Sequence, residues 1–398
     1  MQVRRAYKFL LRPTAKQMAA LKACLEDHRQ LYNAALEERR EAWKRRAAPV
    51  SYYSQAAQLP MIRKADPDGQ GCWSAGSQQQ TLRRLDKAFV AFFRRVKAGQ
   101  MPGYPRFKGR GRFSTVDWPA QKNGARWDSG PDPAVTRVYL LGVGHIRVHQ
   151  HRAVQGTVKM ISVKREGNRW YVILACDDVP AQSLPATGAA VGVDMGVVSF
   201  LTTSDGMHVP NPRPLAAAAA RLADAQQSLS AKKRGSKRHR KAAARIAALH
   251  GKIRRSRLDQ AHKTALTLVR EHDVIAHEAL KIEHMTRRPR PRAAADSSWE
   301  PNGAAAKAGL NKSILDAGWG VFLGVLRAKA EGAGRAVIEV DPRHTSQRCS
   351  QCGCAAAGNR VTQAKFRCLA CGYESHADVN AAQNILRAGL ARQAAGAV

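Results

Sequence analysis

The chain has 398 residues and is 44% hydrophobic, which is enough for two or three folded domains with real cores. Its 66 Lys and Arg outnumber 30 Asp and Glu, and the formal net charge of +36 favours a polyanionic partner, above all nucleic acid. No apolar run approaches the roughly 18 to 20 residues of a spanning helix and no lipidation motif closes the chain, so we expect no membrane partner.

The first hundred residues predict a strand followed by two helices. Apolar side chains alternate over 3–11, which indicates a strand. Thr14, with Gln17 three residues on, forms a capping box, and apolar residues recur at helical spacing to about Arg46. A second helix is expected over 79–97, and we assign its apolar face to the core rather than to base stacking. That face consists of Leu82, Leu85, Phe89, Phe92 and Val96.

The stretch 99–118 is rich in Gly and Pro and interleaves aromatic with basic residues. Its rings could stack on bases while its cations hold phosphates, although a solvated basic loop is an equally weighted alternative. The candidate contacts are Tyr104, Arg106, Phe107, Lys108, Arg110, Arg112 and Phe113. From 135 to 177 the pattern alternates, with a turn at 167–168, which predicts an antiparallel hairpin sheet or small barrel.

After a linker at 180–188, the residues up to 206 read as a tight hairpin in which Asp194 interrupts an apolar strand. An acid there is costly unless it binds something, so Asp194 is a candidate metal ligand. A later short strand, 273–280, carries Glu278 near its end. Asp378 opens the last predicted helix, where an N-cap is the alternative role.

A strongly basic segment, 221–257, carries thirteen Lys or Arg against one acid. We predict a helical hairpin with one buried and one positive face, and we favour nucleic-acid contact over a merely solvated surface. Its candidate contacts are Lys232, Lys233, Arg234, Lys237, Arg238, Arg240 and Lys241. A further helix is expected to end at His272. The low-complexity stretch 287–306 is expected to be a mobile loop, followed by one helix from Leu310 and a strand at 337–340.

Four cysteines near the end of the chain have the spacing of a metal site. Cys349 and Cys352 form one CxxC pair, and Cys368 and Cys371 form a second, so one structural zinc ion is expected. The alternative, two disulfides, needs an oxidising compartment. The basic start lacks the apolar core of a secretory leader, so we expect a cytoplasmic, nucleoid-associated bacterial protein. Cys354 is interpreted as a spectator, although a ligand exchange with Cys352 stays open.

The three embedded acids, in this chain order, describe a ribonuclease-H-like site. In such sites carboxylates bind two divalent ions, one of which activates water while the other stabilises the leaving oxygen. Oxygen ligands with open positions suit Mg²⁺ or Mn²⁺.

Several segments resemble the transposon-encoded TnpB (OrfB) family and the compact type V CRISPR effectors derived from it. The similar segments are GVDMG around Asp194, IAHEAL around Glu278, SILDAGWG, PRHTSQRCSQCG, SHADVNAAQNI around Asp378, and PGYPRFK nearer the start. Two positions depart from the family pattern. Ala377 stands where many relatives carry a basic residue, and His277 stands where an aliphatic residue is common.

The resemblance implies an RNA-guided DNA endonuclease that cuts double-stranded target DNA beside a short flanking motif, in one RuvC-type site, with a guide RNA as partner. The implied catalytic residues are Asp194, Glu278 and Asp378, holding two Mg²⁺ ions. Two alternatives stay open: a guided DNA-binding protein without cleavage, and a ribonuclease-H-like transposase.

The implied fold is multidomain α+β. A wedge-type β-barrel contains an inserted helical recognition lobe and precedes a RuvC-like α/β nuclease domain with an inserted zinc ribbon. The expected boundaries are 1–13 for the first barrel strand, 14–100 for the recognition lobe, 101–182 for the barrel, 183–345 for the nuclease domain, 346–374 for the zinc ribbon and 375–398 for the last nuclease segment.

Overall fold

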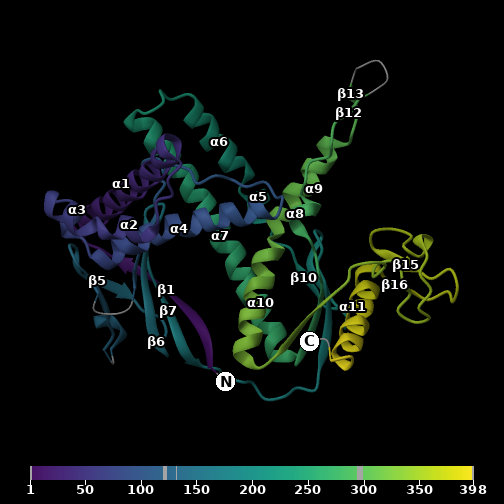
Figure 1. Cartoon of the computed structure of the whole chain (residues 1–398). Coiled ribbons are helices and arrows are strands. Elements are labelled where there is room, and N and C mark those ends of the chain that lie inside the picture. Colours follow the sequence, from purple (N-terminus) through teal and green to yellow (C-terminus); the bar gives the residue numbers. More distant parts are fainter. Residues whose placement is uncertain (1, 120–122, 131, 294–298, 397–398) are drawn as a thin grey trace. The chain divides into compact units, whose positions relative to one another are not determined.

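The computed structural model describes residues 2–119, 123–130, 132–293 and 299–396 (Figure 1). The chain divides into two compact units, Met1–Pro180 and Ala181–Val398. Within the described ranges, no helix is both long and apolar enough to cross a lipid bilayer.

A seven-stranded antiparallel sheet forms the centre of the first unit. Its strand order is β2-β6-β7-β1-β5-β4-β3, and β3 also approaches β6, so the sheet curls into a near-closed barrel. Tyr7, Phe9 and Leu11 of β1 alternate into its core, which confirms the predicted strand and the small barrel. The strands are β1 (Gln2–Arg12), β2 (Thr115–Pro119), β3 (Ala125–Asp128), β4 (Arg137–Leu140), β5 (Gly144–His149), β6 (Thr157–Glu166) and β7 (Arg169–Pro180).

Between β1 and β2 the chain forms the helices of the first unit. Thr14 and Gln17 make the predicted capping box at the start of the first helix. The last of these helices begins at Ala75, earlier than the expected residue 79, because Ser74 caps it. The helices are α1 (Ala15–Arg46), α2 (Tyr52–Ala57), α3 (Leu59–Ala65) and α4 (Ala75–Lys97).

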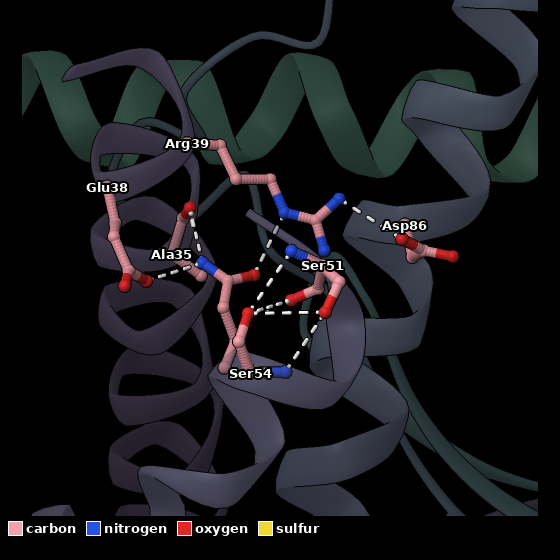
Figure 2. A network of polar contacts seen from close by, with 7 residues as sticks. Ala35, Glu38, Arg39, Ser51, Ser54 and Asp86 are labelled. Atoms are coloured by element: carbon pink, nitrogen blue, oxygen red, sulfur yellow. Dashed lines mark hydrogen bonds and ion pairs between the residues drawn. The ribbon is translucent and has the colours of Figure 1, made fainter. Parts of the chain in front are cut away.

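A buried arginine joins three of these helices, as Figure 2 shows. Arg39 of α1 donates from Nε to Gln55 Oε1 of α2 at 2.9 Å and from Nη1 to Asp86 Oδ1 of α4 at 3.1 Å. Gln55 in turn donates to the Ala35 carbonyl and to Glu38. Since a buried cation is costly without partners, this network favours a single packing of α2 between α1 and α4.

The predicted apolar face of α4 is core only in its first half. Leu82, Leu85 and Phe89 are buried, whereas Val96 is 50% exposed. The prediction that the whole face belongs to the core was therefore wrong for Val96. Beyond Phe89 the helix borders an open pocket of about 450 Å³, and Phe92 packs edge-on against Tyr104. The aromatic residues lining that pocket are Trp43, Phe89, Phe92, Phe93 and Tyr104.

A mixed five-stranded sheet, in the order β10-β9-β8-β11-β14, forms the centre of the second unit. β8, β11 and β14 are parallel. β9 runs antiparallel to β8, and β10, at the edge of the sheet, runs antiparallel to β9. Helices cover both faces. Val191 and Ile275 pack with residues of α7 and α10 on one face, and Ala276 packs with Ile385 of α11 on the other. The strands are β8 (Ala190–Asp194), β9 (Ser199–Thr203), β10 (His208–Pro210), β11 (Val274–Glu278) and β14 (Ala336–Val340).

The helices of this unit differ from expectation at two junctions. One helix, α7, runs unbroken from Lys237 to Glu271, where two helices were expected, because a single Gly251 costs too little to end it. Conversely, the helix expected from Leu310 is two helices that meet at Gly318, whose φ of 75° turns the chain. The helices are α5 (Pro214–Ala217), α6 (Ala219–Ser230), α7 (Lys237–Glu271), α8 (Ile282–Met285), α9 (Ala304–Ala317), α10 (Trp319–Ala333) and α11 (Ala377–Ala394).

The stretch 287–306, expected as a mobile loop, contains a short ribbon of two paired strands, β12 (Arg292–Ala293) and β13 (Trp299–Glu300). Residues 294–298, which belong to the predicted loop, lie outside the described residues. Near the cysteines, β15 (Lys365–Arg367) pairs with β16 (Glu374–His376).

Candidate carboxylate and cysteine sites

The first two predicted metal ligands stand at the ends of neighbouring strands. Asp194 is the last residue of β8, and Glu278 is the last residue of β11. The strands are parallel, and their register pairs Val193 with His277. Because the acid follows directly in each strand, both carboxylates emerge at the same edge of the sheet.

Asp378 reaches this edge from the first turn of α11, which packs on β8, β11 and β14. Gly192 permits that packing, since a Cβ atom there would lie 2.0 Å from the Ala382 carbonyl oxygen. Gly389 makes a second close approach, because its Cβ would lie 2.5 Å from that of Ala276. The helix backbone therefore lies directly on the sheet and carries Asp378 to the ends of the two strands.

Two buried asparagines connect α11 to the loop that contacts Glu278. Asn384 donates to the carbonyl oxygens of Thr345 at 3.0 Å and Arg348 at 2.6 Å, and Asn380 donates to the same Arg348 carbonyl at 2.8 Å. The Thr345 hydroxyl donates to a carboxylate oxygen of Glu278. One polar network thus orients Glu278 and holds the helix that carries the third acid.

The surroundings of Asp194 and Glu278 raise the pKa of both carboxyl groups. Burial, followed by the charges of Glu278 and Asp378, raises the pKa of Asp194 to about 7, and Arg360 partly opposes this. Burial also raises the pKa of Glu278, against the hydrogen bond from Thr345. An acidic cluster that holds a proton near neutral pH provides a favourable position for a cation.

Arg360 supplies the positive charge found beside this cluster. Its Nη2 atom lies 3.2 Å from Asp378 Oδ1, and both side chains are largely buried. Arg360 comes from the segment between the two CxxC pairs, so the cysteine region and the acidic region meet through this ion pair.

The four predicted cysteine ligands converge. Cys349 Sγ lies 3.7 Å from Cys371 Sγ, and Cys352 Sγ lies 3.5 Å from Cys368 Sγ. All four sulfurs lie within 4.8 Å of one another and all are free thiols. Tetrahedral Zn–S bonds of about 2.3 Å put sulfurs roughly 3.8 Å apart, which these separations fit.

The carboxylates are less tightly gathered than the thiols. Among the described residues, the four cysteines alone form a group of three or more potential ligands whose donor atoms all lie within 4.8 Å of one another. Cys354, interpreted as a spectator, is half-buried and stands outside that group. The role of Asp194, Glu278 and Asp378 as ligands of one metal site stays a prediction.

Sequence reasoning missed Arg360, Thr345 and one more buried acid. Asp316, 5% exposed, accepts from Arg257 Nη2 at 2.9 Å and from the backbone N–H of Leu215 at 2.9 Å. These contacts tie α9 to α7 and to the start of α5. Asp316 lies within SILDAGWG, so that similar segment carries a packing role, which a helical pattern alone does not reveal.

The predicted nucleic-acid contacts of the loop 99–118 fall into two groups. Tyr104, Arg106, Phe107 and Arg110 are exposed. Lys108 is half-buried, and hydrogen bonds of its backbone with Asn33 hold it against α1.

One predicted contact of this loop was wrong. Phe113 is 5% exposed and packs against Tyr32 and the Arg84 guanidinium, so its ring cannot stack on a base.

The basic residues around the turn from α6 to α7 are mostly exposed. Lys232 is half-buried and donates to the Ser228 carbonyl at 2.6 Å. The exposed candidates are Lys233, Arg234, Lys237, Arg238, Arg240 and Lys241.

Comparisons with family models match most of this architecture. Residues 163–288 match the OrfB_IS605 model, described as "Probable transposase", and residues 319–385 match the Cas12f1-like TNB domain. Residues 1–47 match a model described as a helix-turn-helix domain, although here they form β1 and one long helix, α1.

Curated relatives resemble either nearly the whole chain or a short part of it. InsQ of Escherichia coli (strain K12), described as a proposed RNA-guided DNA endonuclease, is 33% identical over 98% of this chain and 94% of its own. Cas12f1 of Sulfoacidibacillus thermotolerans, a CRISPR-associated endodeoxyribonuclease, is 63% identical over 14% of each chain.

A solved structure shares the fold. The Cas12f1 chain in its complex with guide RNA and target DNA has a TM-score of 0.55 at 13% identity, covering 96% of this chain and 98% of that one. At this identity the likeness concerns the fold alone. The full-length identity to InsQ carries the assignment: this chain belongs to the TnpB (OrfB, IS605-type) family, which is related to Cas12f.

Proposed function

We propose that this chain is an RNA-guided DNA endonuclease with a single cutting site made of Asp194, Glu278 and Asp378. The observation that carries the proposal is the approach of three acids from β8, β11 and α11 at one sheet edge, where burial and then the charges of Glu278 and Asp378 raise the pKa of Asp194 to about 7. Family membership and the net charge of +36 support nucleic acid as the substrate.

The donor set suits hard divalent cations, because it offers carboxylate oxygens and mutual repulsion that a cation relieves. When bound, two Mg²⁺ or Mn²⁺ ions would activate water and stabilise the leaving oxygen of the phosphodiester. Two properties of the chain's own residues bear on metal binding. Thr345 orients one oxygen of Glu278, and Asp194 must give up its proton before it can act as a ligand.

Arg360 has a natural place in this scheme. With its guanidinium beside Asp378, it offsets negative charge in the metal-free site and would offer N–H donors to a phosphate group of the substrate. The four thiols Cys349, Cys352, Cys368 and Cys371 would hold one structural Zn²⁺, which would keep the segment carrying Arg360 folded.

The remaining parts of the proposal concern domain roles. The barrel would act as the wedge with α1–α4 as the recognition lobe inserted in it. The second unit would be the RuvC-like nuclease with its zinc ribbon at 346–374. The exposed basic residues at 104–110 in the first unit and at 232–241 in the second unit would contact guide RNA or target DNA, read mainly through backbone shape.

The direct test is to express the chain with its native flanking DNA, purify it and sequence the RNA that accompanies it. The purified complex is then incubated with Mg²⁺ and a plasmid library that carries the matching target beside random flanking sequence. We expect a defined RNA species and double-strand cuts that require both that RNA and a subset of flanking sequences. Cutting that proceeds equally well after the RNA is removed would overturn guide dependence.

The matching family model is described as a transposase, so the same assay should include labelled transposon ends. Strand-transfer products joined by the protein alone would favour transposition over guided cleavage.

A further inference from the structure

Three arginines lie side by side on the outer face of the barrel. Arg12 of β1 is directly opposite Arg147 of β5, and Arg147 is directly opposite Arg137 of β4. Opposed residues in antiparallel strands point to the same face of the sheet, and all three side chains are exposed. With strands about 4.8 Å apart, this arginine row is roughly 10 Å wide.

The arginine row is unfavourable for the isolated barrel, because like charges at directly opposed positions repel each other. Throughout the described part of the chain, no acid lies within ion-pair distance of Arg12, Arg137 or Arg147. Asp128 occupies the next position, opposite Arg137 on β3. Its carboxylate is already engaged, by Arg126 at 2.6 Å and by His145 at 3.4 Å.

A depression of about 470 Å³ borders the arginine row. Among the described residues that line it there is no acid, and the polar side chains are two of the arginines, an imidazole and an amide. Guanidinium groups present planar pairs of N–H donors that match phosphate oxygens. The lining residues are Arg12, Ala134, Arg147, Val148, His149 and Gln150.

We propose that the arginine row and this depression bind the phosphodiester backbone of a nucleic acid, which would supply the missing counter-charge. The inference rests on the proposed function only in taking nucleic acid as the partner. It adds a site separate from the basic segments at 104–110 and 232–241. One strand of a duplex presents a phosphate about every 3.4 Å along the axis, so the row spans about three phosphates. A polymer therefore fits it better than a single free phosphate ion.

The test neutralises the row in the full-length protein with the triple substitution R12Q, R137Q and R147Q. The matched control is R4Q, R45Q and R343Q, which removes the same charge from arginines that are 88%, 76% and 84% exposed and have acidic partners. Fluorescence anisotropy then measures binding of a labelled single-stranded RNA and, separately, a labelled DNA duplex of the same sequence, over a series of salt concentrations.

Each phosphate contact contributes about 0.7 (single strand) to 0.9 (duplex) to the slope of log affinity against log salt. We expect the row variant to flatten that slope by about 2 to 3 in at least one arm, relative to the control variant. A change with RNA only assigns the row to guide RNA, and a change with the duplex only assigns it to DNA. Slopes equal to those of the control in both arms would overturn the proposal.

Thermal unfolding of the free protein gives a second readout. Because three opposed cations no longer repel each other, the row variant should unfold at a temperature equal to or above that of the wild type. A lowered unfolding temperature would contradict the view that the row lacks internal counter-charge. If the row variant still performs guided cleavage and both of its salt slopes equal those of the control, the arginine row is not a nucleic-acid site, and the proposed function is unaffected.

Discussion

The cysteine cluster and the carboxylate site belong to the same compact unit, yet the chain assembles them differently. The cysteines come from two short turns, and their sulfurs all lie within 4.8 Å of one another. The acids come from two strands and a helix, and burial, together with the charges of Glu278 and Asp378, raises the pKa of Asp194 to about 7.

This difference teaches how each site depends on the rest of the fold. A CxxC turn carries both of its sulfurs toward one point, so local geometry accomplishes most of the assembly. The carboxylates instead depend on the register of β8 with β11 and on the backbone contact between Gly192 and α11. Damage to tertiary packing should therefore affect the acids first and the thiols last.

The largest effect should follow from changing one acid. Asp194→Asn removes a proposed charged ligand while preserving shape, and we expect target cleavage to fall by at least about 10³-fold with RNA binding unchanged. Asp341→Asn is the matched control, because Asp341 follows strand β14 of the same sheet but is exposed. Single-turnover cleavage with Mg²⁺ gives the rates. A fully active Asp194→Asn protein would show that Asp194 is not part of the cutting site.

Loss of a thiol should act mainly through folding. Cys368→Ser is expected to abolish stoichiometric zinc and to unfold the 346–374 segment, because structural zinc contributes about 10 kcal/mol or more in small zinc modules. Arg360 would then leave Asp378, and cleavage should fall with it. Cys354→Ser is the control and should keep its zinc. Metal analysis and limited proteolysis provide the readouts, and zinc lost from the control instead would show that Cys354 is a ligand.

The stability of the metal-free protein should depend on pH through Asp194. Its pKa is raised from 3.8 to about 7, so between these values the folded state binds more protons than the unfolded state. Stability therefore falls as pH rises from about 4 to about 7, by at most about 4 kcal/mol, and Asp194→Asn should flatten this trend. Denaturant titrations at several pH values measure it. A slope that is the same in the variant would show that the carboxyl does not retain its proton.

A smaller loss is expected where α11 meets the sheet. Gly192→Ala places a methyl group 2.0 Å from the Ala382 carbonyl oxygen, and the overpacking should cost about 1 to 3 kcal/mol. Gly309→Ala is the control, because that helical position has open space and should gain about 0.5 to 1 kcal/mol. Because the acids depend on tertiary packing more than the thiols do, Gly192→Ala should impair cleavage while the zinc content remains complete.

Local signals in the sequence were sufficient where neighbours in the chain are also neighbours in space. The capping box at Thr14, the turn at 167–168 and the paired CxxC turns each involve contacts over a few residues, and all three were predicted correctly. The acids at the ends of β8 and β11 could be singled out because a charge in an apolar strand is costly.

Tertiary structure alone decided which partners surround those residues. Nothing local marks Arg360 as the partner of Asp378, Thr345 as the donor to Glu278, or Asp316 as a packing residue, because each contact joins segments that are distant in the chain. The arginine row is likewise invisible in one dimension, since it depends on the register of three strands. Composition and short spacings determine which chemical groups the chain carries, and long-range packing determines which of them meet.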